Sequence, residues 1–257
     1  MTRFDPERME RMYGSPPIAE QRARTRAALA ARPGERGLDI GTGVGFLACE
    51  LAKEVGAAGH VTGIDLGEEL VDAAREKARR SGVEDQTTFK VGDATSLEIA
   101  DGSLDFVAAV QVYLYVKDID RALREAARVL KPGGRLAVVD TDWDSCVWLT
   151  SDRARHHRIM EARVQEFAQP HLPPMLPRLL QRAGFALKSV EAIPVLNREY
   201  DPDSFSGGII DITAKLATKF GVEAAEAAAW ADDLKSRTAE GEYFFSVNRY
   251  LFLAARR

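Results

Sequence analysis

Residues 38–46 read Leu38-Asp39-Ile40-Gly41-Thr42-Gly43-Val44-Gly45-Phe46, an acid and three glycines at the spacing Asp-x-Gly-x-Gly-x-Gly. The apolar residues before the glycines predict a buried strand at 37–41, and the apolar run after them predicts a helix at 46–55. Glycines let the backbone turn sharply between the two elements and approach a ligand where any Cβ would collide. The stretch therefore predicts a strand-turn-helix unit that binds a nucleotide-like ligand.

Two residues of this stretch argue against a dinucleotide ligand. The dinucleotide motif Gly-x-Gly-x-x-Gly/Ala would place its third small residue at position 46, which holds the bulky Phe46. Asp39 would repel a pyrophosphate, whereas it suits a cationic ligand or one that carries an amino group. The sequence thus disfavours a nicotinamide cofactor, and an NAD(P)-dependent oxidoreductase is kept only as an alternative.

Residues 37–142 alternate short apolar runs with amphipathic stretches, a pattern typical of βα units in a parallel sheet. Beyond the first two elements, the pattern predicts strands at 60–65, 87–91, 104–110 and 135–140. It predicts helices at 68–81 and 119–130, and only a short crossover at 94–101. We therefore expect an α/β fold with helices on both faces of the sheet.

After Trp143 this alternation breaks down. The sequence predicts a helix at 152–168, a Pro-rich break at 170–177 and a short helix at 179–183. Strand-like runs at 185–199 and 242–254 flank an Ala-rich helical segment at 205–240. No repeat or linker marks a second domain. We expect one domain over 1–257, with a ligand-binding core at 35–142, an N-terminal cap at 1–33, and substrate-lid insertions at 143–183 and 201–241.

The composition excludes several classes of protein. Of 257 residues, 46% are hydrophobic and 29% charged, and the formal net charge of −4 gives no attraction to nucleic acid or anionic membranes. No segment reaches the ~18 apolar residues of a membrane span, and the first ten residues are too polar for a signal peptide, so we expect a cytoplasmic protein. The two cysteines and four histidines have no metal-ligand spacing, so we expect no metal.

The motifs taken together resemble a known family. The stretch from Asp39 to Gly45 looks like motif I of the class I S-adenosylmethionine-dependent methyltransferases, and the later motifs follow in the family's order. These later motifs are Asp65, Gly92-Asp93-Ala94, the strand from Asp105-Phe106-Val107 to Gln111-Val112, and Arg128-Val129-Leu130-Lys131-Pro132-Gly133-Gly134-Arg135-Leu136. The resemblance covers 35–142 and is to the small-molecule, type 11-like branch. It implies a Rossmann-like, mostly parallel sheet with an antiparallel C-terminal strand and a helical lid.

The resemblance also implies S-adenosylmethionine as the cofactor, S-adenosylhomocysteine as its product, and a set of residues that bind them. Asp65 matches the acid that receives both ribose hydroxyls, and Asp93 lies in the segment that contacts the adenine amine. Plainer interpretations stay open, since Asp65 can cap the following helix and Asp93 can be an ordinary loop acid. The other positions carried over from the family are Asp39, Gly41, Thr42, Gly43, Gly45, Leu66, Ala94 and Gln111.

Two residues are candidates for catalysis. Tyr13 belongs to an N-terminal segment that often folds over the active site in similar proteins, with a simple anchoring aromatic as the alternative. At helical spacing His157 shares a face with Met160, Val164 and Phe167. It is therefore either a base in the substrate pocket or a hydrogen-bonded histidine in the core.

Three acids near the end of the fifth predicted strand are further candidates. Asp140, Asp142 and Asp144 alternate along the chain, which puts all three on one side of an extended run. One of them could serve as a base or contact a cation, with cap and loop roles as the alternatives. We expect His156, in the helix that follows, to lie in solvent.

The function that these residues imply is transfer of a methyl group to a small acceptor by in-line displacement. Apolar and aromatic residues of the expected lid favour a hydrophobic or aromatic metabolite, and they are Trp143, Trp148, Met160, Phe167, Trp230, Phe244 and Phe245. The motif Asp/Asn-Pro-Pro-Tyr/Phe of exocyclic-amine methylases is absent from 110–115, so we expect no nucleic-acid substrate. A non-methylating S-adenosylmethionine-binding protein or a rearrangement enzyme is the alternative on the same fold. Monomer and homodimer both stay open.

Overall fold

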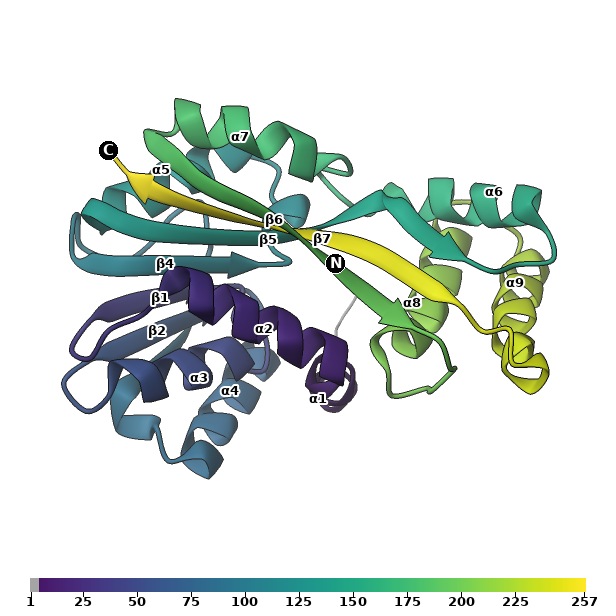
Figure 1. Cartoon of the computed structure of the whole chain (residues 1–257), viewed down its shortest axis with the longest axis horizontal. Helices are drawn as coiled ribbons and strands as arrows, with labels where there is room; N and C mark the ends of the chain where they lie inside the picture. The colour runs from purple at the N-terminus through teal and green to yellow at the C-terminus, as the bar shows by residue number, and fades with distance from the viewer. Residues whose placement is uncertain (1–4) are drawn as a thin grey trace.

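Seven strands of the described chain form one sheet, in the order β3-β2-β1-β4-β5-β7-β6 (Figure 1). The structure is a computed structural model and describes residues 5–257, apart from the side chain of Glu240, so the start of the predicted N-terminal cap lies outside the described residues. The strands are β1 (Arg36–Ile40), β2 (His60–Asp65), β3 (Thr87–Val91), β4 (Leu104–Val110), β5 (Leu130–Trp148), β6 (Phe185–Asn197) and β7 (Phe245–Arg256). Each lies where the sequence predicts a strand, although β5 is much longer than 135–140.

The strand directions confirm the predicted sheet. β1 pairs in parallel with β2 and β4, β2 with β3, and β4 with β5. β7 runs antiparallel to both of its neighbours, β5 and β6. The chain order reverses between β1 and β4, and in open α/β sheets ligands bind at the carboxyl ends of the strands beside such a reversal.

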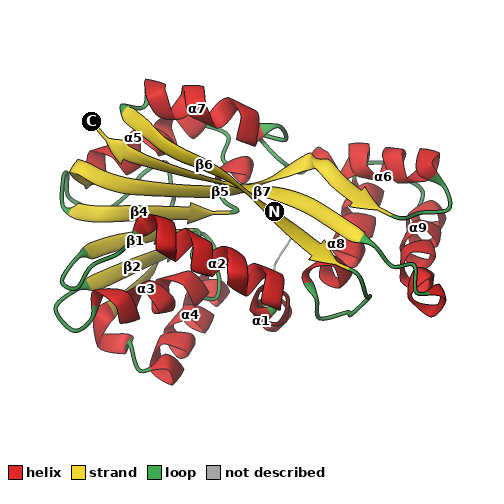
Figure 2. Cartoon of the chain, in the orientation of Figure 1, coloured by secondary structure: helices red, strands yellow, loops and turns green. Residues whose placement is uncertain are grey.

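Helices cover both faces of the sheet (Figure 2). Along β4, Phe106 and Ala108 pack with α2, α3 and α4, whereas Val107 and Ala109 pack with α5 and α7. This alternation of buried residues is what a strand covered on both faces requires. No helix within residues 5–257 is both long and apolar enough to cross a membrane. The helices are α1 (Pro6–Gly14), α2 (Pro16–Leu29), α3 (Phe46–Val55), α4 (Glu68–Ser81), α5 (Ile119–Val129), α6 (Arg153–Val164), α7 (Leu172–Arg182), α8 (Phe205–Lys219) and α9 (Ala224–Ser236), with 3-10 turns η1 (Glu84–Gln86), η2 (Tyr113–Tyr115) and η3 (Arg237–Glu240).

The segments beyond Trp143 differ in detail from the prediction. The break predicted at 170–177 is wrong, because α7 already begins at Leu172. Pro173 and Pro174 lie in its first turn, where a missing N–H costs no hydrogen bond. The Ala-rich segment forms two helices, α8 and α9, and the chain turns between them at Gly221 with a φ of 95°. Figure 1 shows α6, α8 and α9 grouped around the far ends of β5 and β7.

Candidate functional site

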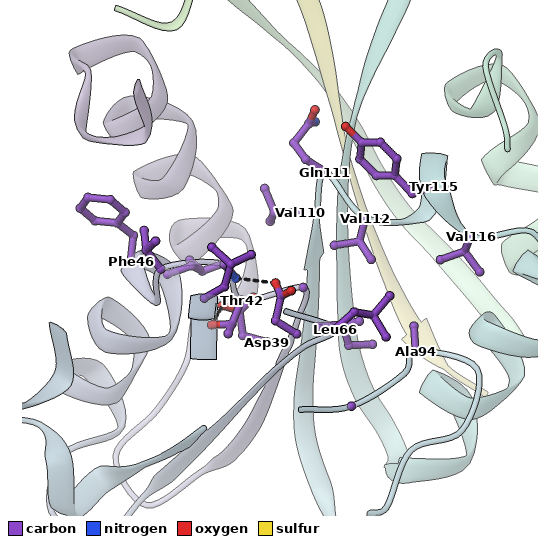
Figure 3. Close-up of a pocket in the computed structure, with 18 of the residues that line it drawn as sticks. Asp39, Thr42, Phe46, Leu66, Ala94, Val110, Gln111, Val112, Tyr115 and Val116 are labelled. Carbon is purple, nitrogen blue, oxygen red and sulfur yellow. Dashed lines mark hydrogen bonds between the residues drawn. The ribbon is translucent and has the colours of Figure 1, made fainter. Parts of the chain in front are cut away.

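A pocket of about 480 Å³ opens at the carboxyl ends of β1, β2 and β4, at the reversal of strand order (Figure 3). Residues of α1 and α2 also line it. Nine of the ten residues predicted to bind the cofactor line it, as does Tyr13. These nine are Asp39, Gly41, Thr42, Gly43, Asp65, Leu66, Asp93, Ala94 and Gln111.

The glycines of the loop between β1 and α3 have different tasks. Gly43 lines the pocket in a left-handed conformation, with a φ of 54°, and its N–H donates to Oδ2 of Asp65 at 2.9 Å. Gly45 does not line the pocket. A Cβ there would lie 2.9 Å from Cβ and 3.0 Å from Cα of Ala74 in α4. Gly45 therefore acts through packing, because it lets the start of α3 lie directly against α4.

Asp65 ends β2 and holds the glycine loop. Its Oδ2 accepts the N–H of Gly43, and its Oδ1 accepts the N–H of Gly67 at 3.0 Å. The residue that caps α4 is Gly67, so the plain capping interpretation does not describe Asp65. A carboxylate has about four acceptor positions, and two of them remain for a ligand in the pocket.

Asp93 and Ala94 form the neighbouring wall of the pocket, after β3. Oδ1 of Asp93 accepts hydrogen bonds from N and Oγ1 of Thr95, at 2.8 and 2.9 Å, so this acid shapes its own turn. Among residues 5–257, Oδ2 of Asp93 accepts no hydrogen bond from the protein. Figure 3 shows Leu66 and Ala94 on the same side of the pocket, where they add apolar surface beside these polar groups.

Asp39 is a buried acid at the base of the pocket. Only 2% of it is exposed, and its Oδ2 accepts a hydrogen bond from the Thr42 hydroxyl at 2.8 Å. Burial raises the pKa of Asp39 to about 7, and the nearby charge of Asp65 acts in the same direction. A cationic group in the pocket would stabilise the ionised form of Asp39, so this acid is suited to bind one.

Gln111 and Tyr115 lie at the other end of the pocket, beyond Val110 and Val112 (Figure 3). Gln111 has a φ of 60°, a conformation that costs a non-glycine residue about 1–3 kcal/mol. Its N–H donates to the carbonyl of Val139 at 2.7 Å, and its Oε1 accepts the Thr141 hydroxyl at 2.6 Å. These contacts with β5 hold the strained turn and fix the side chain beside the pocket.

The N-terminal helix α1 brings Tyr13 to the pocket. The carbonyl of Tyr13 accepts from Nη1 of Arg22 at 2.5 Å. Glu10 pairs with Lys77 of α4 at 2.7 Å, and Arg8 pairs with Asp211 of α8 at 3.0 Å. Helix α1 therefore connects the helices beside the glycine loop to those at the far end of the sheet.

We expect Gly208→Ala to weaken this closure. An added Cβ on Gly208 in α8 would lie 2.2 Å from Sδ of Met12, so the buried side chain of Met12 would have to move and disturb the packing of α1 on α8. Such overpacking costs about 1–3 kcal/mol, and we expect S-adenosylhomocysteine, the ligand that the resemblance implies, to bind about tenfold more weakly. Fluorescence titration measures this, with Lys215→Ala on the exposed side of α8 as the control. Equal affinity of the Gly208 variant and the wild type would show that α1 does not shape the pocket.

His157 lies outside the pocket, and its predicted surroundings are wrong. Its side chain is 76% exposed and pairs with Glu161 at 3.1 Å. His156 is the half-buried residue instead, since Nε1 of Trp230 donates to its Nδ1 at 3.0 Å, and burial lowers the pKa of His156. The buried residues of α6 are Ile159, Ala162 and Arg163, and the helix packs on α8 and α9. This buried face lies one position away from the face inferred from the spacing.

The three acids predicted to alternate near the end of the fifth strand lie within β5, and the structure does not bring all three together. Asp140 is fully buried near the backbone N–H groups of 112–114, but neither carboxylate oxygen forms a hydrogen bond of ordinary geometry within the described residues. Asp142 accepts from the N–H of Asp144, and Asp144 pairs with His171 at 2.6 Å on the surface. Asp140 and Asp142 pair in regular register with Tyr250 and Asn248, so these two acids follow the predicted alternation. The register of β5 shifts after Asp142, and only Asp144 departs from the prediction.

The lid aromatics chosen from the sequence do not line this pocket. Trp148 packs on Phe245 and Trp230, with ring centroids 4.6 and 5.5 Å apart. Phe167 approaches the pocket most directly, because its ring lies 5.3 Å from that of Tyr115. Two residues that sequence reasoning missed, Arg163 and Arg249, are buried in the same region, and no motif or spacing distinguishes them from surface arginines.

The comparisons with known proteins agree with this geometry. Residues 38–138 match a family model described as "Methyltransferase domain". A 37.1 kDa protein in transposon TN4556 of Streptomyces fradiae is 34% identical over 231 residues, which are 88% of this chain and 64% of that protein. The methyltransferase GfsG of Streptomyces halstedii is 39% identical over 128 residues, 48% of this chain and 45% of that protein. The chain thus spans less than two thirds of the length of either relative.

The fold also matches solved structures. The crystal structure of the [4+2]-cyclase SpnF superposes with a TM-score of 0.62 over 93% of this chain and 80% of that chain, at 23% identity. At this identity the likeness concerns the fold alone.

Proposed function

We propose that the chain is a class I S-adenosylmethionine-dependent methyltransferase that methylates a small, hydrophobic or aromatic acceptor. The observation that carries this proposal is the pair of acids, Asp39 and Asp65, at adjacent strand ends around the glycine loop. A ligand with both a positive charge and neighbouring hydroxyl groups suits this pair, whereas a pyrophosphate does not. The pocket of about 480 Å³ is also of the size usual for cofactor sites.

Several residues of the pocket would hold the cofactor. Asp65 offers its two free acceptor positions to the ribose hydroxyls, and Leu66 and Ala94 offer apolar surface to the adenine. Asp39 supplies a negative charge for the amino-acid end. S-adenosylmethionine supplies a methyl group on a positively charged sulfur, which keeps the electron pair of the broken carbon–sulfur bond when the acceptor takes the methyl group.

The contribution of this chain to the reaction is then mainly positioning. Holding two reactants in line at contact distance can lower a barrier by about 7–11 kcal/mol. Burial raises the pKa of Tyr13, so its hydroxyl keeps its proton at neutral pH. Tyr13 therefore acts as a hydrogen-bond donor that orients the acceptor, and no role of His157 as a base is part of this proposal.

A cofactor-consumption screen tests the proposal. The purified chain is incubated with S-adenosylmethionine and panels of quinones, phenols, amines and amino-acid derivatives, and S-adenosylhomocysteine is quantified by mass spectrometry. We expect at least one acceptor class to release S-adenosylhomocysteine in equal amount to the methylated product. Binding of NADH in place of S-adenosylmethionine would contradict the proposal.

A second candidate is a non-methylating enzyme on the same fold, because a pocket that binds S-adenosylmethionine does not by itself require methyl transfer. In that case the chain would bind S-adenosylmethionine and convert a substrate without methylating it. The same screen separates the two functions, because a non-methylating enzyme would consume its substrate and release no S-adenosylhomocysteine.

The pKa of Asp39 makes the affinity for the cofactor depend on pH. Because this pKa is about 7, the carboxyl is largely neutral at pH 6 and largely ionised at pH 7.5. A bound cation favours the ionised form, so the affinity for S-adenosylhomocysteine should rise roughly fivefold to tenfold between these pH values. Calorimetric titration should also show proton release on binding. The variant Asp39→Asn should bind weakly and equally at both pH values, and a flat wild-type profile would exclude this coupling.

A further inference from the structure

Two arginines lie buried beside the pocket without a counter-ion. Arg249 of β7 is 0% exposed and Arg163 of α6 is 2% exposed. Neither forms an ion pair with any carboxylate among residues 5–257. Burying a guanidinium without an opposite charge costs several kcal/mol, on the order of the whole stability margin of many domains. We call Arg163 and Arg249 the buried arginine pair.

Aromatic faces hold the buried arginine pair but leave many of its N–H groups unused. Cζ of Arg163 lies 3.7 Å from the centre of the Trp143 ring and 5.4 Å from that of Phe167. Cζ of Arg249 lies 4.5 Å from the centre of the Phe205 ring. One N–H of Arg249 donates to Gln21, whereas Nε of both arginines and Nη2 of Arg249 are buried without a partner.

The buried arginine pair stands directly behind residues that line the pocket. Gln21, the hydrogen-bond partner of Arg249, is one of these lining residues. Phe167, which packs against Arg163, also contacts Tyr115 of the pocket wall. Tyr115 keeps 41% of its surface exposed, and the positive charges of both arginines act on Tyr13. The pair therefore makes the end of the pocket beyond Gln111 electropositive.

Asp140 does not neutralise this end of the pocket. Asp140 is fully buried, yet it lies beyond ion-pair distance of Arg249. Burial raises the pKa of Asp140 well above its ordinary value, against the smaller opposing effect of Arg249, and this favours the neutral carboxyl. Burial also lowers the pKa of Arg163, but only to about 10, so Arg163 stays positively charged at neutral pH. The buried arginine pair thus keeps a positive charge behind this end of the pocket.

We propose that the methyl acceptor is an aromatic carboxylate whose anionic group binds the unpartnered N–H groups of the buried arginine pair. This inference rests on the proposed methyltransferase function and names the acceptor class. A guanidinium matches the two oxygens of a carboxylate. Tyr115, which lines the pocket and whose ring lies 5.3 Å from that of Phe167, supplies aromatic surface for the body of such an acceptor. Such an acceptor supplies the opposite charge that the free protein lacks.

Matched pairs of charged and neutral probes test this inference. The protein saturated with S-adenosylhomocysteine is titrated at constant ionic strength with 4-hydroxybenzoate, 1-naphthoate and indole-3-acetate, and with the primary amide of each. Binding is followed by the shift in melting temperature. We expect each acid to bind about tenfold or more tightly than its amide, because hydrogen bonds to charged groups are worth about 1.5–3 kcal/mol. Equal binding of acids and amides, or binding of neither, would overturn the inference.

Variants then assign the preference to the buried arginine pair. Arg163→Met and Arg249→Met should each remove most of the preference for the acids, while Arg153→Met, on the exposed face of the same α6, should keep it. Unchanged affinity for S-adenosylhomocysteine shows that a variant is folded. Since methionine removes an unpaired buried charge, Arg163→Met should also melt no lower than the wild type in the absence of probes. If the wild type binds S-adenosylhomocysteine but prefers no acid, this inference fails while the proposed function stands.

Discussion

Replacing Asp65 with alanine should weaken the binding of S-adenosylhomocysteine by about 100-fold or more. The carboxylate would lose two charge-assisted hydrogen bonds to ribose hydroxyls, each worth about 1.5–3 kcal/mol. It would also lose its hold on the glycine loop, because Oδ1 and Oδ2 accept the N–H groups of Gly67 and Gly43. Calorimetric titration of the purified variant measures the loss, and activity at a fixed cofactor concentration should fall with it.

A matched control separates this effect from a general loss of negative charge. Asp72 lies on the exposed side of α4, where it pairs with Arg75 at 2.7 Å and does not reach the pocket. Asp72→Ala should therefore bind S-adenosylhomocysteine as the wild type does. If Asp65→Ala bound within threefold of the wild type, Asp65 could not be the ribose acid, and the cofactor assignment would lose its main support.

Gly45→Ala should lower the free energy of unfolding by about 2–5 kcal/mol. Part of the loss, about 1–2 kcal/mol, comes from the left-handed backbone, since Gly45 has a φ of 82°. The rest comes from overpacking, because the new Cβ would lie 2.9 Å from Cβ and 3.0 Å from Cα of Ala74. No side-chain rotation can move Cα and Cβ of Ala74 out of contact, so α3 and α4 must move apart. Urea unfolding followed by circular dichroism measures the loss.

Gly133→Ala is the matched control for the backbone contribution alone. Gly133 also has a left-handed φ, of 76°, but no atom lies within 4 Å of the position of an added Cβ. We expect this variant to lose only about 1–2 kcal/mol. Equal losses in the two variants would mean that the close approach of Gly45 to α4 contributes nothing to stability.

The cofactor-binding half of the structure is predictable because local sequence and fold agree there. Residues buried on both faces of a parallel sheet give continuous apolar runs, and this makes β4 with its Phe106 and Val107 easy to place. Glycines and acids at strand ends mark the turns that face a ligand, and this pattern identifies Asp39, Asp65 and Asp93. These signals lie within a few residues of one another in the sequence.

The rest of the site depends on contacts between segments far apart in the chain. Arg163 and Arg249 resemble surface residues in the sequence, and residues far away in the chain bury them. Trp143 covers Arg163, and Gln21 and Phe205 cover Arg249. The burial of His156 and His157 is the reverse of the prediction for a similar reason, since His157 is exposed and His156 is half-buried. Helix α6 packs against two other helices and has no clear apolar stripe in its sequence. An error of one position in the predicted buried face is therefore enough to exchange the burial of His156 and His157.

The central claim is that the pocket at the ends of β1 and β2 binds S-adenosylmethionine and its product. Isothermal titration of the wild-type chain with S-adenosylhomocysteine tests this claim most directly. We expect saturable binding at one site per chain, in the micromolar range or tighter, that NADH does not compete away. Absence of measurable heat at millimolar S-adenosylhomocysteine, or displacement of S-adenosylhomocysteine by NADH, would contradict the claim.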